Sequence, residues 1–233
     1  MSHSLDLDLL DIDGAVRESA EAAGFDRSDF LKKGVLAGGG LIAGSALLSQ
    51  FNVAEAAISK TKLSKKNDVK ILNFALTLEF LEAAFYREAD TNKVYGPDLA
   101  LQRFTQVVRR HEAQHVAFLK GALGTKAIKS PRFDFGKAVT DKATFAATAQ
   151  LLEDTGVTAY LGQVGNIFQK GVLASAGTIA TVEARHAAWI RFINNPAVPA
   201  TAIKDLPAPA TFDKRKSEAS ILRAVGKTGF IKS

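Results

Sequence analysis

Two stretches of the chain, Glu112-Ala113-Gln114-His115 and Glu183-Ala184-Arg185-His186, repeat one pattern in which a glutamate is followed three residues later by a histidine. Residues three apart lie on the same face of an α-helix, so each stretch presents a carboxylate and an imidazole side by side. A hard or borderline metal ion prefers this pair of ligands. Two such helices facing each other would form a site for two metal ions.

A second repeat accompanies the first. Leu78-Glu79 is followed seven residues later by Tyr86, and Leu152-Glu153 is followed at the same spacing by Tyr160. The order along the chain is therefore a lone glutamate, a Glu-x-x-His pair, and then the same two features again. This order predicts a duplicated helical hairpin with halves of roughly 70 residues. It is also the ligand arrangement of a di-iron carboxylate bundle.

The stretch from Val69 to Asn194 resembles the ferritin-like superfamily. Within it, the segments Leu72-Asn73-Phe74-Ala75-Leu76-Thr77-Leu78-Glu79-Phe80-Leu81-Glu82-Ala83-Ala84-Phe85-Tyr86 and Glu153-Asp154-Thr155-Gly156-Val157 resemble the branch that includes the plant desiccation-related proteins. The resemblance implies an all-α, ferritin-like four-helix bundle made of two antiparallel helix pairs. It also implies metal chemistry, with two iron ions, or alternatively two manganese ions, as cofactors.

Helical periodicity and breaking residues place the four helices. The first is expected over Asp68–Asp90, and the second from Pro97-Asp98 to Gly121 or Gly124, with proline in its first turn. A long connection around Ser130-Pro131 joins the halves. The third helix is expected from an N-cap at Thr140-Asp141 to about Gly165, and the fourth from Lys170 to Asn194, before Pro196.

The predicted metal ligands are one lone glutamate and one Glu-x-x-His pair from each half: Glu79, Glu112, His115, Glu153, Glu183 and His186. Buried carboxylates need neutralising charge, and two divalent ions would balance four ionised glutamates. Either Glu112 and Glu183 or the lone glutamates would bridge the ions, and the sequence does not choose between them. A single Glu-x-x-His pair could simply stabilise a helix, but two copies, each preceded by a glutamate, favour ligands.

Several neighbouring residues have alternative interpretations. Glu82 lies one turn from Glu79 and competes with it for the ligand role, whereas Asp154 is expected to point away. Tyr86 and Tyr160 are interpreted mainly as core residues with satisfied hydroxyls, with an outer hydrogen bond or a redox role as the alternative. His111 is turned about 100° from its neighbour Glu112, so it is expected outside the ligand shell or at the surface.

Composition narrows the chemistry further. The chain has no cysteine, which excludes disulfides, thiolate metal sites and iron–sulfur clusters. Residues 1–56 hold nine acids and four bases, which leaves 26 bases against 15 acids and a net charge of +11 in the remainder. Aromatic residues do not interleave with these bases, so a solvated basic face is expected rather than a specific nucleic-acid site.

The chain divides into a leader and export signal at 1–56, the bundle at 66–195, and a proline-containing strap with a basic tail at 196–233. Asp26-Arg27-Ser28-Asp29-Phe30-Leu31-Lys32-Lys33 resembles a twin-arginine export motif with a single arginine. A weak apolar run over 34–48 and Ala54-Glu55-Ala56-Ala57 follow it, so cleavage is expected after Ala56. The sequence thus predicts a periplasmic or extracellular protein; the alternative is an uncleaved N-terminal anchor.

The leading functional hypothesis is an exported protein with a dinuclear iron or manganese centre that oxidises ferrous iron or activates dioxygen or peroxide. The alternative is a non-catalytic stress or desiccation-related envelope protein, whose site is structural or vacant. Metal ions are the expected partners, and association with the cell envelope or with further copies of the chain is compatible with the sequence. Fold alone does not choose among these reactions.

Overall fold

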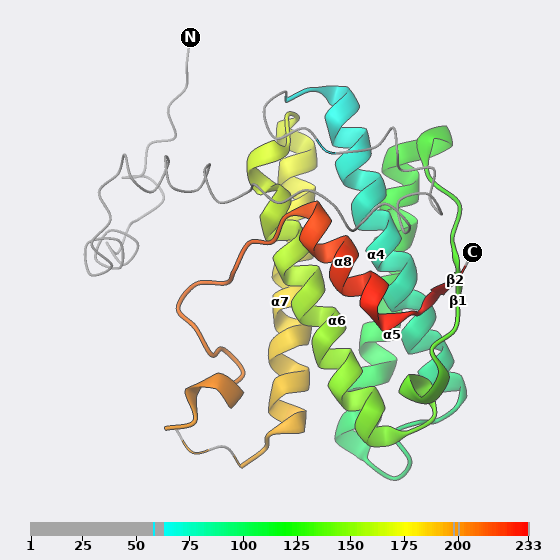
Figure 1. Cartoon of the computed structure of the whole chain (residues 1–233), viewed down its shortest axis with the longest axis vertical. Helices are drawn as coiled ribbons and strands as arrows, with labels where there is room; N and C mark the ends of the chain where they lie inside the picture. The colour runs from blue at the N-terminus through cyan, green and yellow to red at the C-terminus, as the bar shows by residue number, and fades with distance from the viewer. Residues whose placement is uncertain (1–57, 59–62, 198, 200, 233) are drawn as a thin grey trace. The chain divides into compact units, whose positions relative to one another are not determined.

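The computed structural model describes residues 58, 63–197, 199 and 201–232, and the predicted leader, export motif and cleavage site lie outside them. Four long α-helices form the bundle: α4 (Lys65–Thr91), α5 (Leu99–Leu123), α6 (Lys142–Gln163) and α7 (Lys170–Asn194). Figure 1 shows α4 paired with α5 and α6 paired with α7. This confirms the predicted all-α, ferritin-like bundle.

Side-chain caps set the start of three of these helices. In each case a side-chain oxygen accepts a hydrogen bond from the backbone N–H three residues ahead; the capping residues are Ser64, Asp98 and Asp141. The bond satisfies a donor that has no partner inside the helix. Asp98 is the cap of α5, so Pro97 precedes the helix rather than lying in its first turn. Helix α6 ends at Gln163, slightly before the expected Gly165, and a short 3-10 turn, η5 (Val164–Asn166), follows.

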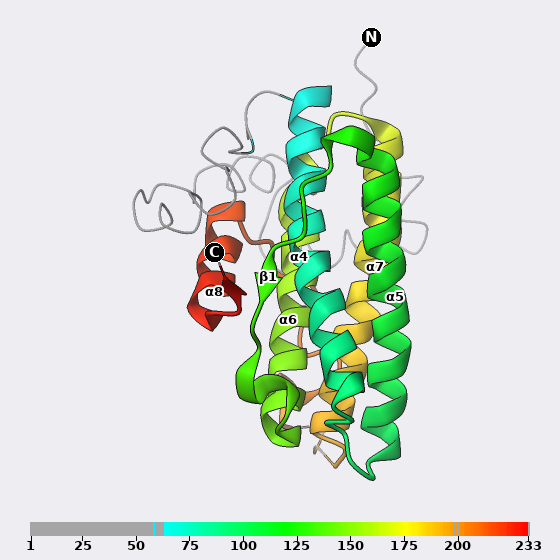
Figure 2. The same ribbon diagram turned by 90° about the vertical axis from the view of Figure 1, so that its right-hand side faces the viewer.

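A long connection joins α5 to α6 and returns the chain to the other end of the bundle (Figure 2). It contains two 3-10 turns, η3 (Gly124–Lys126) and η4 (Gly136–Val139), and a short strand, β1 (Arg132–Phe133). Because of this return, α5 and α6 run in the same direction. The lone glutamate of each hairpin can therefore lie opposite the Glu-x-x-His helix of the other hairpin.

The C-terminal segment packs on the outside of the bundle. It contains a 3-10 turn, η6 (Ile203–Asp205), helix α8 (Glu218–Thr228) and strand β2 (Ile231–Lys232). Strand β2 pairs antiparallel with β1, Arg132 opposite Lys232, and Figure 2 shows α8 beside β1 and outside the four long helices. Apolar side chains of α8, including Ile221 and Val225, are buried against the bundle core.

The apolar core forms two clusters, whose residues on α5 and α7 lie on opposite sides of the predicted ligands. On α5, Leu101–Val108 contribute to the first cluster and Leu119–Leu123 to the second, with Glu112 and His115 between them. On α7, Ile179 and Ile190 flank Glu183 and His186 in the same way. The fold therefore places the predicted ligands in a polar layer between two apolar clusters. No helix among the described residues is both long and apolar enough to cross a membrane.

Candidate metal centre

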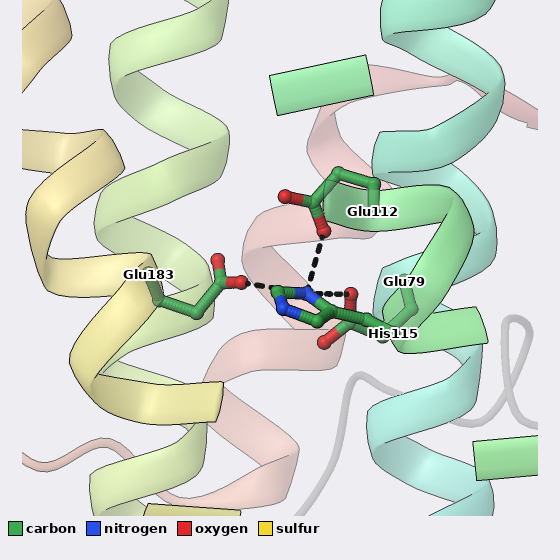
Figure 3. Close-up of side chains that lie close together, drawn as sticks. All are labelled: Glu79, Glu112, His115 and Glu183. Atoms are coloured by element: carbon green, nitrogen blue, oxygen red, sulfur yellow. Dashed lines mark hydrogen bonds and ion pairs between the residues drawn. The ribbon is translucent and has the colours of Figure 1, made fainter. Parts of the chain in front are cut away.

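Side chains from all four long helices meet in this polar layer. The structure brings together all six predicted residues in two overlapping groups of four, within each of which the candidate ligand atoms lie no more than 4.8 Å apart. The first group is Glu79, Glu112, His115 and Glu183 (Figure 3), and the second is Glu112, Glu153, Glu183 and His186. Glu112 and Glu183 belong to both groups. The two groups therefore overlap through two shared carboxylates.

Both histidines direct the Nδ1 atom of their ring into the cluster. His115 Nδ1 lies 3.2 Å from an oxygen of each of Glu79, Glu112 and Glu183. His186 Nδ1 lies 3.2 Å from oxygens of Glu112 and Glu153. One ring N–H can donate to a single oxygen at good geometry, so it cannot satisfy two or three carboxylates at once. A cation with several coordination positions could satisfy them.

Some buried polar atoms of the cluster have no hydrogen-bond partner among the described residues. They are Glu112 Oε1, Glu153 Oε2, both carboxylate oxygens of Glu183, and His186 Nδ1. An unpartnered buried polar atom costs about 1–3 kcal/mol, and an unpaired charge costs more. Oxygen and imidazole nitrogen atoms that converge without partners are the donor set that iron and manganese accept. The residues therefore fit a metal centre.

Two tyrosines hold the lone glutamates from opposite halves of the chain. The Tyr86 hydroxyl donates to Glu153 Oε1, and the Tyr160 hydroxyl donates to Glu79 Oε1 at 2.5 Å. Each tyrosine is buried, and each lies one half away in sequence from the glutamate that it contacts. The hydroxyls are satisfied, as a core interpretation requires, but their acceptors are the predicted ligands. The outer hydrogen bond is thus the arrangement observed.

Burial dominates the protonation of four carboxyl groups. It raises the pKa of Glu79 to about 8, and the nearby Glu112 carboxylate adds to the effect. Burial also raises the pKa of Glu153, and it raises the pKa values of Glu82 and Glu183 well above the ordinary range. In metal-free protein, several of these groups therefore keep their protons near neutral pH. A bound cation would displace them.

Ion pairing dominates at Glu112 and at the two histidines. Burial alone would raise the pKa of Glu112, but the contact with His115 and the nearby His186 ring lower it to about 2. Burial alone would lower the histidine pKa values, but the surrounding carboxylates raise them to about 12 for His115 and about 10 for His186. Metal-free protein thus neutralises part of the cluster with imidazolium ions, which a metal ion must deprotonate before it binds.

Glu82 adds a fifth buried carboxylate, which the sequence interpretation treated as a rival of Glu79. Both are buried, and Glu82 lies on the same face of α4, one turn further along. The offset of 74 residues between Glu79 and Glu153 places Gly156 at the position equivalent to Glu82. A Cβ atom at Gly156 would lie 2.8 Å from Glu183 Oε2 and 3.5 Å from Glu82 Oε1. The glycine leaves the space that these carboxylates occupy.

His111 supports His186 from outside the cluster. Its Nδ1 lies 2.8 Å from His186 Nε2, and the two rings stack with centroids 5.1 Å apart. This contact occupies the outer nitrogen of His186 and leaves Nδ1 for the cluster, as supporting partners of metal-bound histidines commonly do. Asp154 instead pairs with Arg191, at 2.5 Å, and takes no part in the cluster. The sequence expected both placements, but it did not identify the partner of His111.

A comparison with protein-family models gave one match, to the ferritin-like domain, over residues 67–196. The chain belongs to the ferritin-like domain family. The matched range covers all four bundle helices except the first two residues of α4, and it contains every predicted ligand. A search of curated proteins gave no match. Family membership therefore supports the bundle and a buried Glu/His cluster that could hold metal, whereas the reaction depends on the site itself.

Gly156→Ala tests the packing of this ferritin-like site. Its methyl group would press on Glu183 Oε2, so we expect binding of ferrous iron, titrated without oxygen, to weaken about 10-fold or more. The matched control is Gly177→Ala on α7, where an added Cβ meets nothing within 4 Å. The control should bind iron normally and gain up to about 1 kcal/mol of stability. Equal iron affinity in both variants would contradict the tight packing around Glu183.

Proposed function

We propose that the chain binds two iron or manganese ions, with Glu79, Glu112 and His115 on one ion and Glu153, Glu183 and His186 on the other. Glu112 and Glu183 would be within reach of both ions, because each belongs to both groups of the cluster. The observation that carries the proposal is the convergence of buried, unpartnered carboxylate oxygens and an unpartnered imidazole nitrogen.

The proposed reaction is oxidation of bound ferrous iron by dioxygen or peroxide. With dioxygen, two ferrous ions each give up one electron, and dioxygen takes two electrons and two protons to form hydrogen peroxide. The chain's own groups would position the ions, exclude bulk water and supply protons. The carboxyl group of Glu82, which is not among the proposed ligands, is suited to hold a proton, because burial raises its pKa.

Elemental analysis tests the centre directly. Protein purified from its native source should contain about two iron or manganese ions per chain by this proposal, and the double variant Glu112→Ala, Glu183→Ala should contain none. The exposed Glu88→Ala on α4 is the matched control and should retain both ions. Metal-free protein from the native source, with the same thermal stability in wild type and double variant, would rule out the dinuclear centre.

Oxygen consumption separates the enzyme from its alternative. Adding ferrous iron to metal-free wild type should consume one dioxygen molecule for every two ferrous ions, and the double variant should not accelerate this reaction. A protein that binds two ions and gains stability, yet consumes no dioxygen or peroxide, would instead be a non-catalytic protein with a structural centre. The desiccation-related branch that the sequence resembles would then give the better account.

We also propose export to the periplasm or the extracellular space. The support is the single-arginine motif at 26–33, the apolar run at 34–48 and the absence of cysteine, which makes the chain insensitive to an oxidising compartment. Mass spectrometry of the protein from its native source should find a mature N-terminus at Ala57. An intact N-terminus in a membrane fraction would favour the anchored alternative.

A further inference from the structure

An apolar pocket lies at the end of the bundle where α4 and α7 begin and α5 and α6 end. All four helices line it, and its walls include Ile71, Ala75, Leu119, Tyr160, Ser175 and Ile179. Its empty space, counted with the solvent at its mouth, is about 470 Å³, but the enclosed part has room for little more than one small molecule. Almost all of the exposed lining is apolar.

This pocket ends beside the metal cluster. Ala75 lies four residues before Glu79, Leu119 four after His115, and Ile179 four before Glu183, so each wall residue is about one helical turn, roughly 5–6 Å, from a proposed ligand. Tyr160 lies between the pocket and the cluster. Its ring lines the pocket and its hydroxyl donates to Glu79 Oε1. A molecule in the pocket is therefore one side chain away from the centre.

The opposite end of the cluster, around Tyr86, is packed with aromatic rings. Phe85 and Phe104 contact the Tyr86 ring edge-on, with centroids 5.2 and 5.8 Å away. The offset between the lone glutamates makes Ala159 the counterpart of Phe85, and the offset between the Glu-x-x-His pairs makes Ser175 the counterpart of Phe104. Both small residues line the pocket. The two ends of the cluster therefore differ: aromatic side chains fill the space around Tyr86, whereas small residues leave a pocket at the other end.

We propose that this pocket binds dioxygen and delivers it to the metal centre past Tyr160, an inference that rests on the function proposed above. A small non-polar gas loses no hydrogen bonds on entering an apolar cavity. Hydrogen peroxide would leave its donors and acceptors unsatisfied there, at a cost of order 1–3 kcal/mol for each polar group on the protein mutational scale. The pocket therefore selects dioxygen over peroxide as the oxidant that enters by this route.

Xenon tests the pocket without metal and without turnover, because it is an apolar atom of suitable size. Metal-free wild-type crystals under xenon pressure should show a xenon peak between Ile71, Ser175 and Ile179. Ser175→Phe restores the aromatic residue of the other half and should abolish the peak. Ala174→Phe, at the neighbouring exposed position on α7, is the matched control and should retain it. Absence of xenon from the wild-type pocket would overturn the proposal.

Oxidation kinetics then test delivery. In iron-loaded protein, Ser175→Phe should lower the second-order rate constant for reaction with dioxygen and leave the rate with hydrogen peroxide unchanged, while Ala174→Phe changes neither. Equal dioxygen rates in all three proteins would overturn the route and leave the proposed function standing. A loaded wild type that consumes no dioxygen would overturn both, even if xenon occupied the pocket, so the two failures are distinguishable.

Discussion

Loading the protein with metal should raise its melting temperature by about 5–10 °C at neutral pH. A ligand that binds only the folded state at 100 times its dissociation constant adds about 2.7 kcal/mol, and 1 kcal/mol corresponds to about 2–4 °C for a domain of this size. A bound metal ion should stabilise the folded state strongly, because the cluster contains five buried carboxylates and several unpartnered polar atoms. Differential scanning calorimetry with and without a chelator measures the shift.

The metal-free protein should also lose stability as the pH rises from about 5 to 9. Glu79, with a folded pKa of about 8 and an ordinary value of 4.5, binds more protons in the folded state than in the unfolded state across that interval. His186, raised from 6.5 to about 10, does the same above pH 6.5. Stability falls with pH wherever the folded state holds more protons. Glu112, lowered to about 2, acts oppositely, but only below about pH 4.5.

Metal should remove this dependence, because the ion replaces the protons that the cluster otherwise takes up. The stabilisation by metal should therefore grow between pH 5 and pH 9. The double variant Glu112→Ala, Glu183→Ala provides the control, since it should show neither the metal shift nor its growth with pH. A wild-type melting temperature that is independent of added metal across this range would contradict a metal-binding cluster.

The sequence predicts the bundle well because its signals are local and repeated. Helix boundaries follow from capping residues such as Asp141 and from Pro196, which ends the fourth helix without any tertiary information. The convergence of the two Glu-x-x-His helices follows from duplication. A single copy would have carried little weight, since such pairs also occur on solvent-exposed helices. Two copies on the inner face of a four-helix bundle leave few other arrangements.

What the sequence could not supply is the contact between one half and the other. The spacing from Glu79 to Tyr86 suggests a contact within one half, yet Tyr86 bonds Glu153 and Tyr160 bonds Glu79. Such exchange depends on the packing of α4 against α6, which no local pattern encodes. The same holds for Glu82, whose place in the cluster depends on the space left by Gly156 in the other half. The Glu79-x-x-Glu82 spacing was the available signal.

The C-terminal tail crosses α6 at a point where only glycine fits. A Cβ atom at Gly162 would lie 1.9 Å from the backbone oxygen of Lys216, closer than any two such atoms can approach. The tail is fixed there by a hydrogen bond from the Lys216 N–H to the Thr158 carbonyl, at 3.1 Å. Helix α8 begins two residues later and buries Ile221 in the core. Displacing Lys216 would therefore loosen the whole helix.

Gly162→Ala should consequently destabilise the protein by about 1–3 kcal/mol, the usual cost of overpacking, although alanine is the better helix former. We expect trypsin to cleave after Lys214 or Arg215 much faster than in wild type, because the displaced segment becomes accessible. Gly171→Ala on α7 is the matched control, since its added Cβ meets nothing within 4 Å. Metal content should stay at the wild-type level in both variants, because none of the proposed ligands comes from the tail. Equal trypsin sensitivity in the two variants would mean that the close approach of Lys216 to α6 does not hold the tail.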